Sequence, residues 1–117
     1  MARKTSRASI AVAVDSQVGT SSIISSNWGV HQGTVIFAKI IIPAYTNNIT
    51  TNIYIIDSDG DRIYPFLALA KGATHIVSDL QIPLVSGEYF EAELSGVPGG
   101  LTAYTIYVTL YYISDYK

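Results

Sequence analysis

The chain has 117 residues, enough for one domain with a sizeable hydrophobic core. Only 14% of the residues are charged, and Ile, Val and Thr together account for 35 of them, a composition typical of β-sheets. It excludes a helical bundle, a coiled coil and an acidic disordered chain.

The charges are divided unevenly along the chain. Arg3, Lys4 and Arg7 make a short basic arm, residues 1–7, whereas residues 8–117 form one domain with four basic and nine acidic side chains. An acidic domain argues against nucleic-acid binding. No apolar stretch approaches the roughly 20 residues of a membrane-spanning helix, so we expect no membrane partner. The absence of Cys excludes disulfides and thiol chemistry.

Apolar and polar residues alternate in short segments separated by turn-forming residues, a pattern that predicts strands. The apolar run IAVAV near the start is too short for a signal peptide and fits the first strand. In chain order the predicted strands cover residues 9–14, 23–24, 34–42, 49–57, 62–65, 73–78, 80–84, 88–94 and 102–113. The segment 66–72 is the best helical candidate, with one or two turns ending at Gly72.

About eight short strands with regularly spaced turns predict an all-β fold, a single antiparallel β-sandwich of jelly-roll type. The expected core residues are Ile10, Val12, Ile53, Ile55, Phe90, Leu94, Ile106, Val108 and Leu110. If the Ile106 side of the last strand faces the core, Tyr107 and Tyr111 stand on its outer side. Exposed tyrosines on a surface of low charge are typical of protein interfaces, although isolated tyrosines also cover ordinary sheets.

The most site-like cluster is DSDGD, residues 57–61. Its Asp-Gly pair favours a hairpin turn, with a weak ion site as the alternative, because the spacing of an EF-hand is absent. His31 and His75 have no partners at metal-ligand spacing, and the chain contains no nucleophile or phosphate-binding motif. We therefore expect no enzyme activity, no catalytic residues, no cofactor and no metal.

Trp28 is the single Trp and lies in a polar segment. It either closes one end of the core, the favoured interpretation, or offers a flat ring on which a sugar can stack. Candidate interface residues are therefore Arg3, Lys4, Arg7, Trp28, Tyr107 and Tyr111.

The two stretches Ile42–Tyr64 and Ile82–Ile113 resemble small Cys-free β-sandwich proteins of tailed bacteriophage particles. The resemblance lies in the DSDG hairpin, the LALAKGA segment, the SGE turn, and the SGVPGG loop before a long Thr- and Tyr-rich strand. It implies a non-enzymatic virion protein, first of all a capsid decoration (cement) protein on the capsid surface that bridges and stabilises subunits of the major capsid protein. A head–tail connector or tail accessory protein, or a carbohydrate-binding attachment module, is the alternative.

Self-association is expected as well, because a small domain with so few charges covers its surface with Ser, Thr, Tyr and Ala. The resemblance favours a homo-oligomer with three subunits, since capsid lattices offer local three-fold positions.

Overall fold

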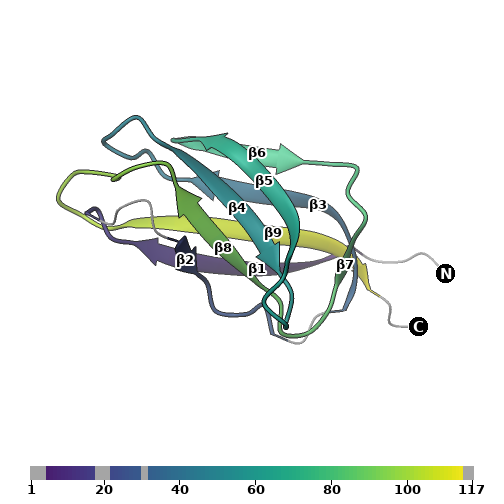
Figure 1. Cartoon of the computed structure of the whole chain (residues 1–117). Coiled ribbons are helices and arrows are strands. Elements are labelled where there is room, and N and C mark those ends of the chain that lie inside the picture. Colours follow the sequence, from purple (N-terminus) through teal and green to yellow (C-terminus); the bar gives the residue numbers. More distant parts are fainter. Residues whose placement is uncertain (1–4, 18–21, 30–31, 115–117) are drawn as a thin grey trace.

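Two antiparallel sheets pack face to face in the computed structural model of the chain (Figure 1), which describes residues 5–17, 22–29 and 32–114. The nine strands, in chain order, are β1 (Thr5–Val14), β2 (Ser22–Ile24), β3 (Gly33–Ile42), β4 (Thr50–Ile56), β5 (Arg62–Ala70), β6 (Ala73–Val77), β7 (Ile82–Leu84), β8 (Tyr89–Leu94) and β9 (Tyr104–Ser114). Nothing in the described part of the chain forms a helix long and apolar enough to cross a membrane.

The order of the strands is that of a jelly roll. One sheet has the order β1-β9-β3-β6, with β7 also paired to β3, and the other has the order β2-β8-β4-β5. In the sequence, the antiparallel pairs are nested one inside the next, which is the jelly-roll arrangement: β1·β9, β2·β8, β3·β6 and β4·β5. The predicted all-β sandwich is confirmed.

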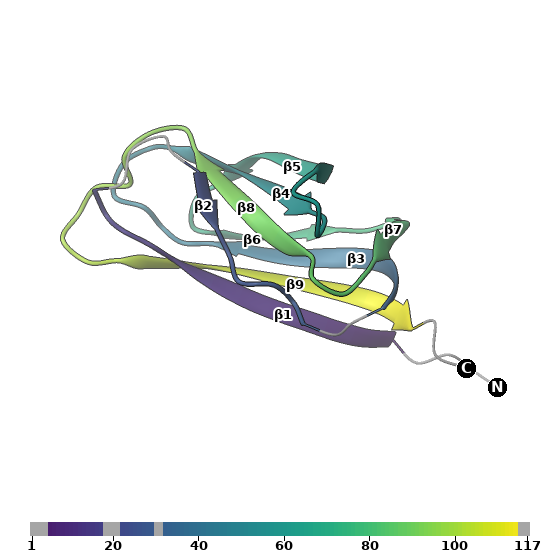
Figure 2. The same cartoon turned by 60° about the horizontal axis from the view of Figure 1, so that its bottom comes forward.

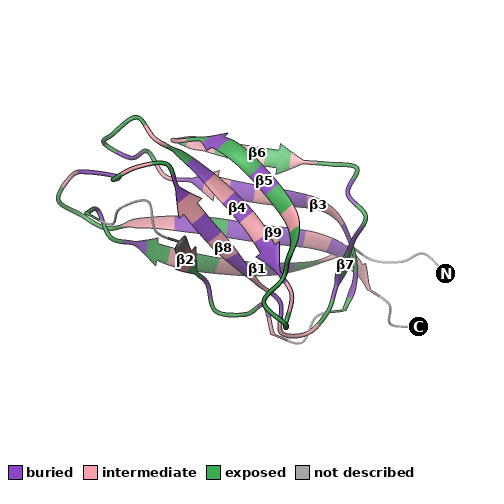
Figure 3. Cartoon of the chain, viewed as in Figure 1, coloured by how far each residue is buried: buried purple, intermediate pink, exposed green. Residues whose placement is uncertain are grey.

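The core lies between the two sheets, where buried residues alternate mainly with residues of intermediate exposure along each central strand (Figure 3). Seven of the nine predicted core residues are 1% exposed or less: Ile53, Ile55, Phe90, Leu94, Ile106, Val108 and Leu110. Ile10 and Val12 are only half-buried, which corrects the prediction. The reason is position, since β1 lies at the edge of its sheet and one of its sides has no neighbouring strand.

The predicted helix at residues 66–72 is wrong, because β5 continues as a strand to Ala70. In β5 two residues, Leu67 and Ala68, lie opposite the single residue Asn52 of β4, which makes a β-bulge. Ala68 takes the left-handed backbone conformation there (φ 54°), and its N–H donates to Asn52 Oδ1 at 2.7 Å. The bulge places the buried Phe66 and Leu69 three residues apart, a spacing that imitates a helix.

Candidate functional site: the outer face of the β1-β9-β3 sheet

The side chains on the outer side of the β1-β9-β3 sheet form three rows across the three strands. Residues directly opposite one another on paired strands point to the same side of a sheet. The registers therefore give the rows Arg7–Tyr111–Phe37, Ser9–Thr109–Lys39 and Ala11–Tyr107–Ile41. We call these nine residues the tyrosine face.

A shallow hollow of about 400 Å³ lies within the tyrosine face. Ser9, Ala11 and Thr109 are small and form its floor, and the hydroxyl groups of Ser9 and Thr109 are 2.9 Å apart. Larger side chains, among them Arg7, Lys39 and Tyr107, line the same hollow. The contrast between small and large residues on neighbouring strands makes the surface concave.

Two aromatic groups frame the hollow. The rings of Tyr111 and Phe37 stack with centroids 4.2 Å apart and planes 13° from parallel. This stack depends on a bulge in β3, where Ile36 is the extra residue and reverses the alternation, so that Phe37 turns outward while Ala38 turns to the core. Tyr107 stands more freely, with 49% of its surface exposed. Tyrosine rings held on a rigid sheet give contact area with little loss of side-chain entropy on binding.

The tyrosine face is basic. Arg7 and Lys39 lie on it, and none of the described strands of this sheet contains Asp or Glu. Among the described residues, neither cation forms an ion pair, whereas Arg62 pairs with Glu91 and Lys71 Nζ donates to the carbonyl oxygens of Tyr45 and Asn47. The two charges are therefore available to an anionic partner.

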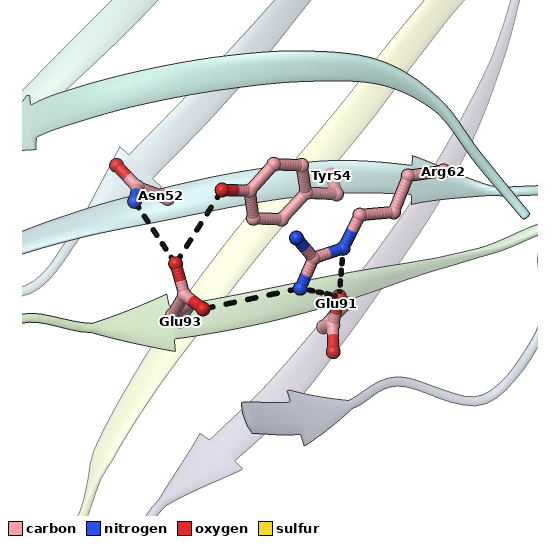
Figure 4. Close-up of polar contacts among 5 residues, drawn as sticks. All are labelled: Asn52, Tyr54, Arg62, Glu91 and Glu93. Carbon is pink, nitrogen blue, oxygen red and sulfur yellow. Dashed lines mark hydrogen bonds and ion pairs between the residues drawn. The ribbon is translucent and has the colours of Figure 1, made fainter. Parts of the chain in front are cut away.

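The outer side of the other sheet has the opposite character (Figure 4). The Arg62 guanidinium lies 2.9 Å from Glu91 and 3.9 Å from Glu93, and it stacks on the Tyr54 ring at 3.9 Å. Glu93 also accepts hydrogen bonds from Asn52 Nδ2 at 3.1 Å and from the Tyr54 hydroxyl at 3.4 Å. With two carboxylates and one guanidinium, this network is net acidic and its polar groups are already engaged with one another.

The structure brings together three of the six candidate interface residues: Arg7, Tyr107 and Tyr111 all belong to the tyrosine face. Arg7 lies within β1, which begins at Thr5, and Arg3 and Lys4 lie outside the described residues. Trp28 does not lie on the tyrosine face: it is 6% exposed and packs on Phe90 with ring centroids 6.0 Å apart, in agreement with the favoured interpretation. It closes one end of the core and offers no open ring to a sugar.

The structure also adds Lys39, Ile41 and Phe37, which the sequence analysis did not single out. The alternation of residues 34–42 gave a signal that Lys39 and Ile41 share one side of a strand. The bulge at Ile36, which brings Phe37 to the same side, has no comparable sequence signal.

The acidic cluster forms the tight turn between β4 and β5. Asp57 Oδ1 accepts hydrogen bonds from the N–H groups of Asp59 and Asp61, both at 2.9 Å, and Gly60 takes the left-handed conformation (φ 89°). The predicted hairpin is confirmed. Across residues 5–17, 22–29 and 32–114, no three His, Asp or Glu side chains are grouped to hold a metal ion.

Neither histidine joins the tyrosine face in the described structure. The His75 ring nitrogen Nε2 lies 2.9 Å from the carbonyl oxygen of Ala70 and forms a hydrogen bond with it. His31 lies outside the described residues.

Comparison with known proteins gives no match to a family model and no match among curated proteins. Among solved structures, the chain is similar to one from the cyanophage Pam1 capsid asymmetric unit, with a TM-score of 0.62 and 15% identity over 95% of this chain and 86% of that one. A chain of infectious bursal disease virus, strain Gx, gives a TM-score of 0.43 and 12% identity over 98% of this chain and 33% of that one. This chain therefore has a fold that also occurs in a viral capsid.

Proposed function

We propose that this chain is a non-enzymatic structural protein of a virus particle, and that it acts as a decoration protein on the capsid surface. The observation that carries the proposal is the likeness to a chain of the cyanophage Pam1 capsid, because it covers nearly the whole of both chains. The two matched chains are of similar length, and the phage proteins that this sequence resembles are small β-sandwiches of the same kind.

The tyrosine face is the part of the molecule that we assign to the capsid contact. It combines exposed aromatic area, a concave shape and two cations, Arg7 and Lys39, that form no ion pair among the described residues. Aromatic and Arg side chains are enriched at protein interfaces, and a basic patch speeds association with an acidic partner. The proposed partner surface is therefore an acidic patch formed by neighbouring subunits of the major capsid protein, which this chain bridges.

The test has two parts. Quantitative mass spectrometry of purified particles should find this chain in numbers comparable to the major capsid protein. A small fixed number per particle would instead favour the connector or tail role and would contradict decoration. The second part is rebinding of the purified chain to particles from which it has been removed, measured at low and high salt.

Lys39→Glu should weaken rebinding at least tenfold and reduce its salt dependence, because it reverses one of the two positive charges on the tyrosine face. The control is Leu101→Glu with Ala103→Glu, two exposed loop positions that together give the same change of net charge elsewhere. Equal loss in both variants would show a general charge effect and would remove the tyrosine face from the proposal. Binding to glycans that depends on Tyr107, with no binding to particles, would favour an attachment module instead.

A further inference from the structure

The four free edges of the two sheets differ in how well they are protected against pairing with another strand. An exposed edge presents unpaired backbone N–H and C=O groups, and proteins usually shield it by shortness, Pro, bulges or charges. β2 has only three residues, and β5 contains Pro65 and two irregularities in its pairing with β4. β6 and β7 share the far edge of β3 as two short pieces, separated by residues 78–81.

β1 has none of these protections except one charge. Its ten residues pair with β9 without a break in register, and the segment TSRASIAVAV contains no Pro, no Gly and only Arg7 as a charged residue. It ends the strand order of its sheet, and Figure 2 shows it along the outer margin of the sandwich. Within the described residues, no other strand pairs with its free side.

We propose that two copies of this chain pair along their β1 edges, antiparallel and about a two-fold axis, so that the two sheets become one continuous sheet. The inference goes beyond the proposed function and does not rest on it, since it concerns the purified chain alone. It also competes with the trimer expected from the sequence resemblance.

The charge of Arg7 favours antiparallel over parallel pairing of the two β1 strands. A two-fold axis perpendicular to the sheet, placed at Ser9 or Ile10 near the middle of β1, sets Arg7 opposite Ala11 or Ala13 of the second copy. The two Arg7 side chains then start about 14 Å or more apart along the paired strands, beyond the screening length of about 8 Å at physiological salt. Parallel pairing in register would place them side by side, about 5 Å apart, and like charges there oppose association.

The partial burial of two apolar residues of β1 also favours pairing with a second copy. Ile10 and Val12 face the core but remain half-buried at the edge, and a second β1 would cover them. A ten-residue strand is about 33 Å long. Pairing over that length would satisfy the outward N–H and C=O groups of β1 and would cover Ile10 and Val12 at the edge of the core.

Sedimentation velocity over a concentration series, from micromolar to millimolar, tests the proposal on the purified chain. We expect a reversible dimer of the 12.7 kDa chain. Ala11→Lys with Ala13→Lys should weaken the dimer at least tenfold, because both positions are exposed and one of them faces Arg7 in either register. Adding Arg7→Glu to that variant should restore the dimer.

The matched control is Thr74→Lys with Ile76→Lys, two exposed residues of β6 at the opposite edge of the same sheet, which should leave the dimer unchanged. Far-UV circular dichroism checks that each variant is folded. Should the β1 variant fail to fold, hydrogen exchange of the unmodified chain replaces it, with β1 amides gaining protection as concentration rises. A wild-type monomer at all concentrations, a trimer mass, or a dimer that the β1 variant leaves intact would overturn the proposal.

Discussion

Replacing Trp28 by Phe tests how the buried indole contributes to the stability of the core. The indole is 6% exposed, and its Nε1 is buried with no hydrogen-bond partner among the described protein atoms. A buried donor without a partner costs about 1 to 3 kcal/mol. Trp28→Phe removes that donor while keeping an aromatic ring against Phe90.

Two losses of stability oppose the gain from removing the indole N–H. Phe buries about 40 Å² less apolar surface than Trp, a loss of about 1 kcal/mol, and a residual cavity of about 40 Å³ costs about 1 kcal/mol more. These losses nearly cancel the gain from removing the orphaned N–H. We therefore expect the free energy of unfolding of Trp28→Phe to stay within about 1 kcal/mol of the wild type, whereas Trp28→Ala should lose about 3 to 5 kcal/mol.

Urea unfolding followed by far-UV circular dichroism is the suitable assay, because both substitutions remove the only Trp and with it the usual fluorescence signal. A loss of about 3 kcal/mol in Trp28→Phe would refute the reasoning, because it would mean that the indole N–H has a partner whose hydrogen bond is lost as well. A negligible loss in Trp28→Ala would show that the ring is not part of the core.

Two further predictions concern the core and the pH dependence of stability. Val108→Asp places an unpaired charge at a fully buried position and should lower the free energy of unfolding by about 4 kcal/mol or more. Tyr107→Asp, at the adjacent but exposed position, should stay folded. Thermal melts compare the two variants, and equal melting temperatures would contradict the assigned faces. Burial, reinforced by the charge of Asp57, raises the pKa of Glu88, whose Oε1 accepts the Val85 N–H at 3.0 Å. The folded state therefore holds the Glu88 proton at a pH where the unfolded chain has lost it, so stability falls as pH rises through that window. Glu88→Gln should remove this fall in urea titrations between about pH 4 and pH 8, and a curve parallel to the wild type would contradict the assignment.

The sequence predicted best where one strand has one buried side over its whole length. In β9 the split between Ile106, Val108 and Leu110 on one side and Tyr107 and Tyr111 on the other follows directly from alternation, and the structure places them so. Bulges defeat the same reasoning, because a single extra residue changes which side every later residue faces. This happened in β5, where it imitated a helix, and in β3, where it turned Phe37 outward.

The composition of the tyrosine face could be predicted only in part, because it depends on long-range pairing. Arg7 and Lys39 are 32 positions apart and share the face because β9, from the end of the chain, lies between their strands. Alternation predicts the side on which each residue lies, yet it carries no information about which strand becomes its neighbour. The polar start of β1, Thr5–Arg7, likewise has no strand signature and becomes a strand through its pairing with Tyr111, Tyr112 and Ile113.

The two proposals constrain one another through geometry. A two-fold axis perpendicular to the sheet turns the tyrosine faces of both copies to the same side, so a β1-paired dimer would present two basic hollows to one acidic surface. The opposite side would present the outer sides of the two β2-β8-β4-β5 sheets, with the net acidic networks of Arg62, Glu91 and Glu93. Two linked contacts raise the effective concentration of the second one, so attachment gains without any new residue. A β1 variant outside the tyrosine face, Thr5→Lys with Ala13→Lys, sets like charges opposite one another in either register. It should then bind particles more weakly than the wild type although the tyrosine face is intact, and unchanged binding would separate self-association from attachment.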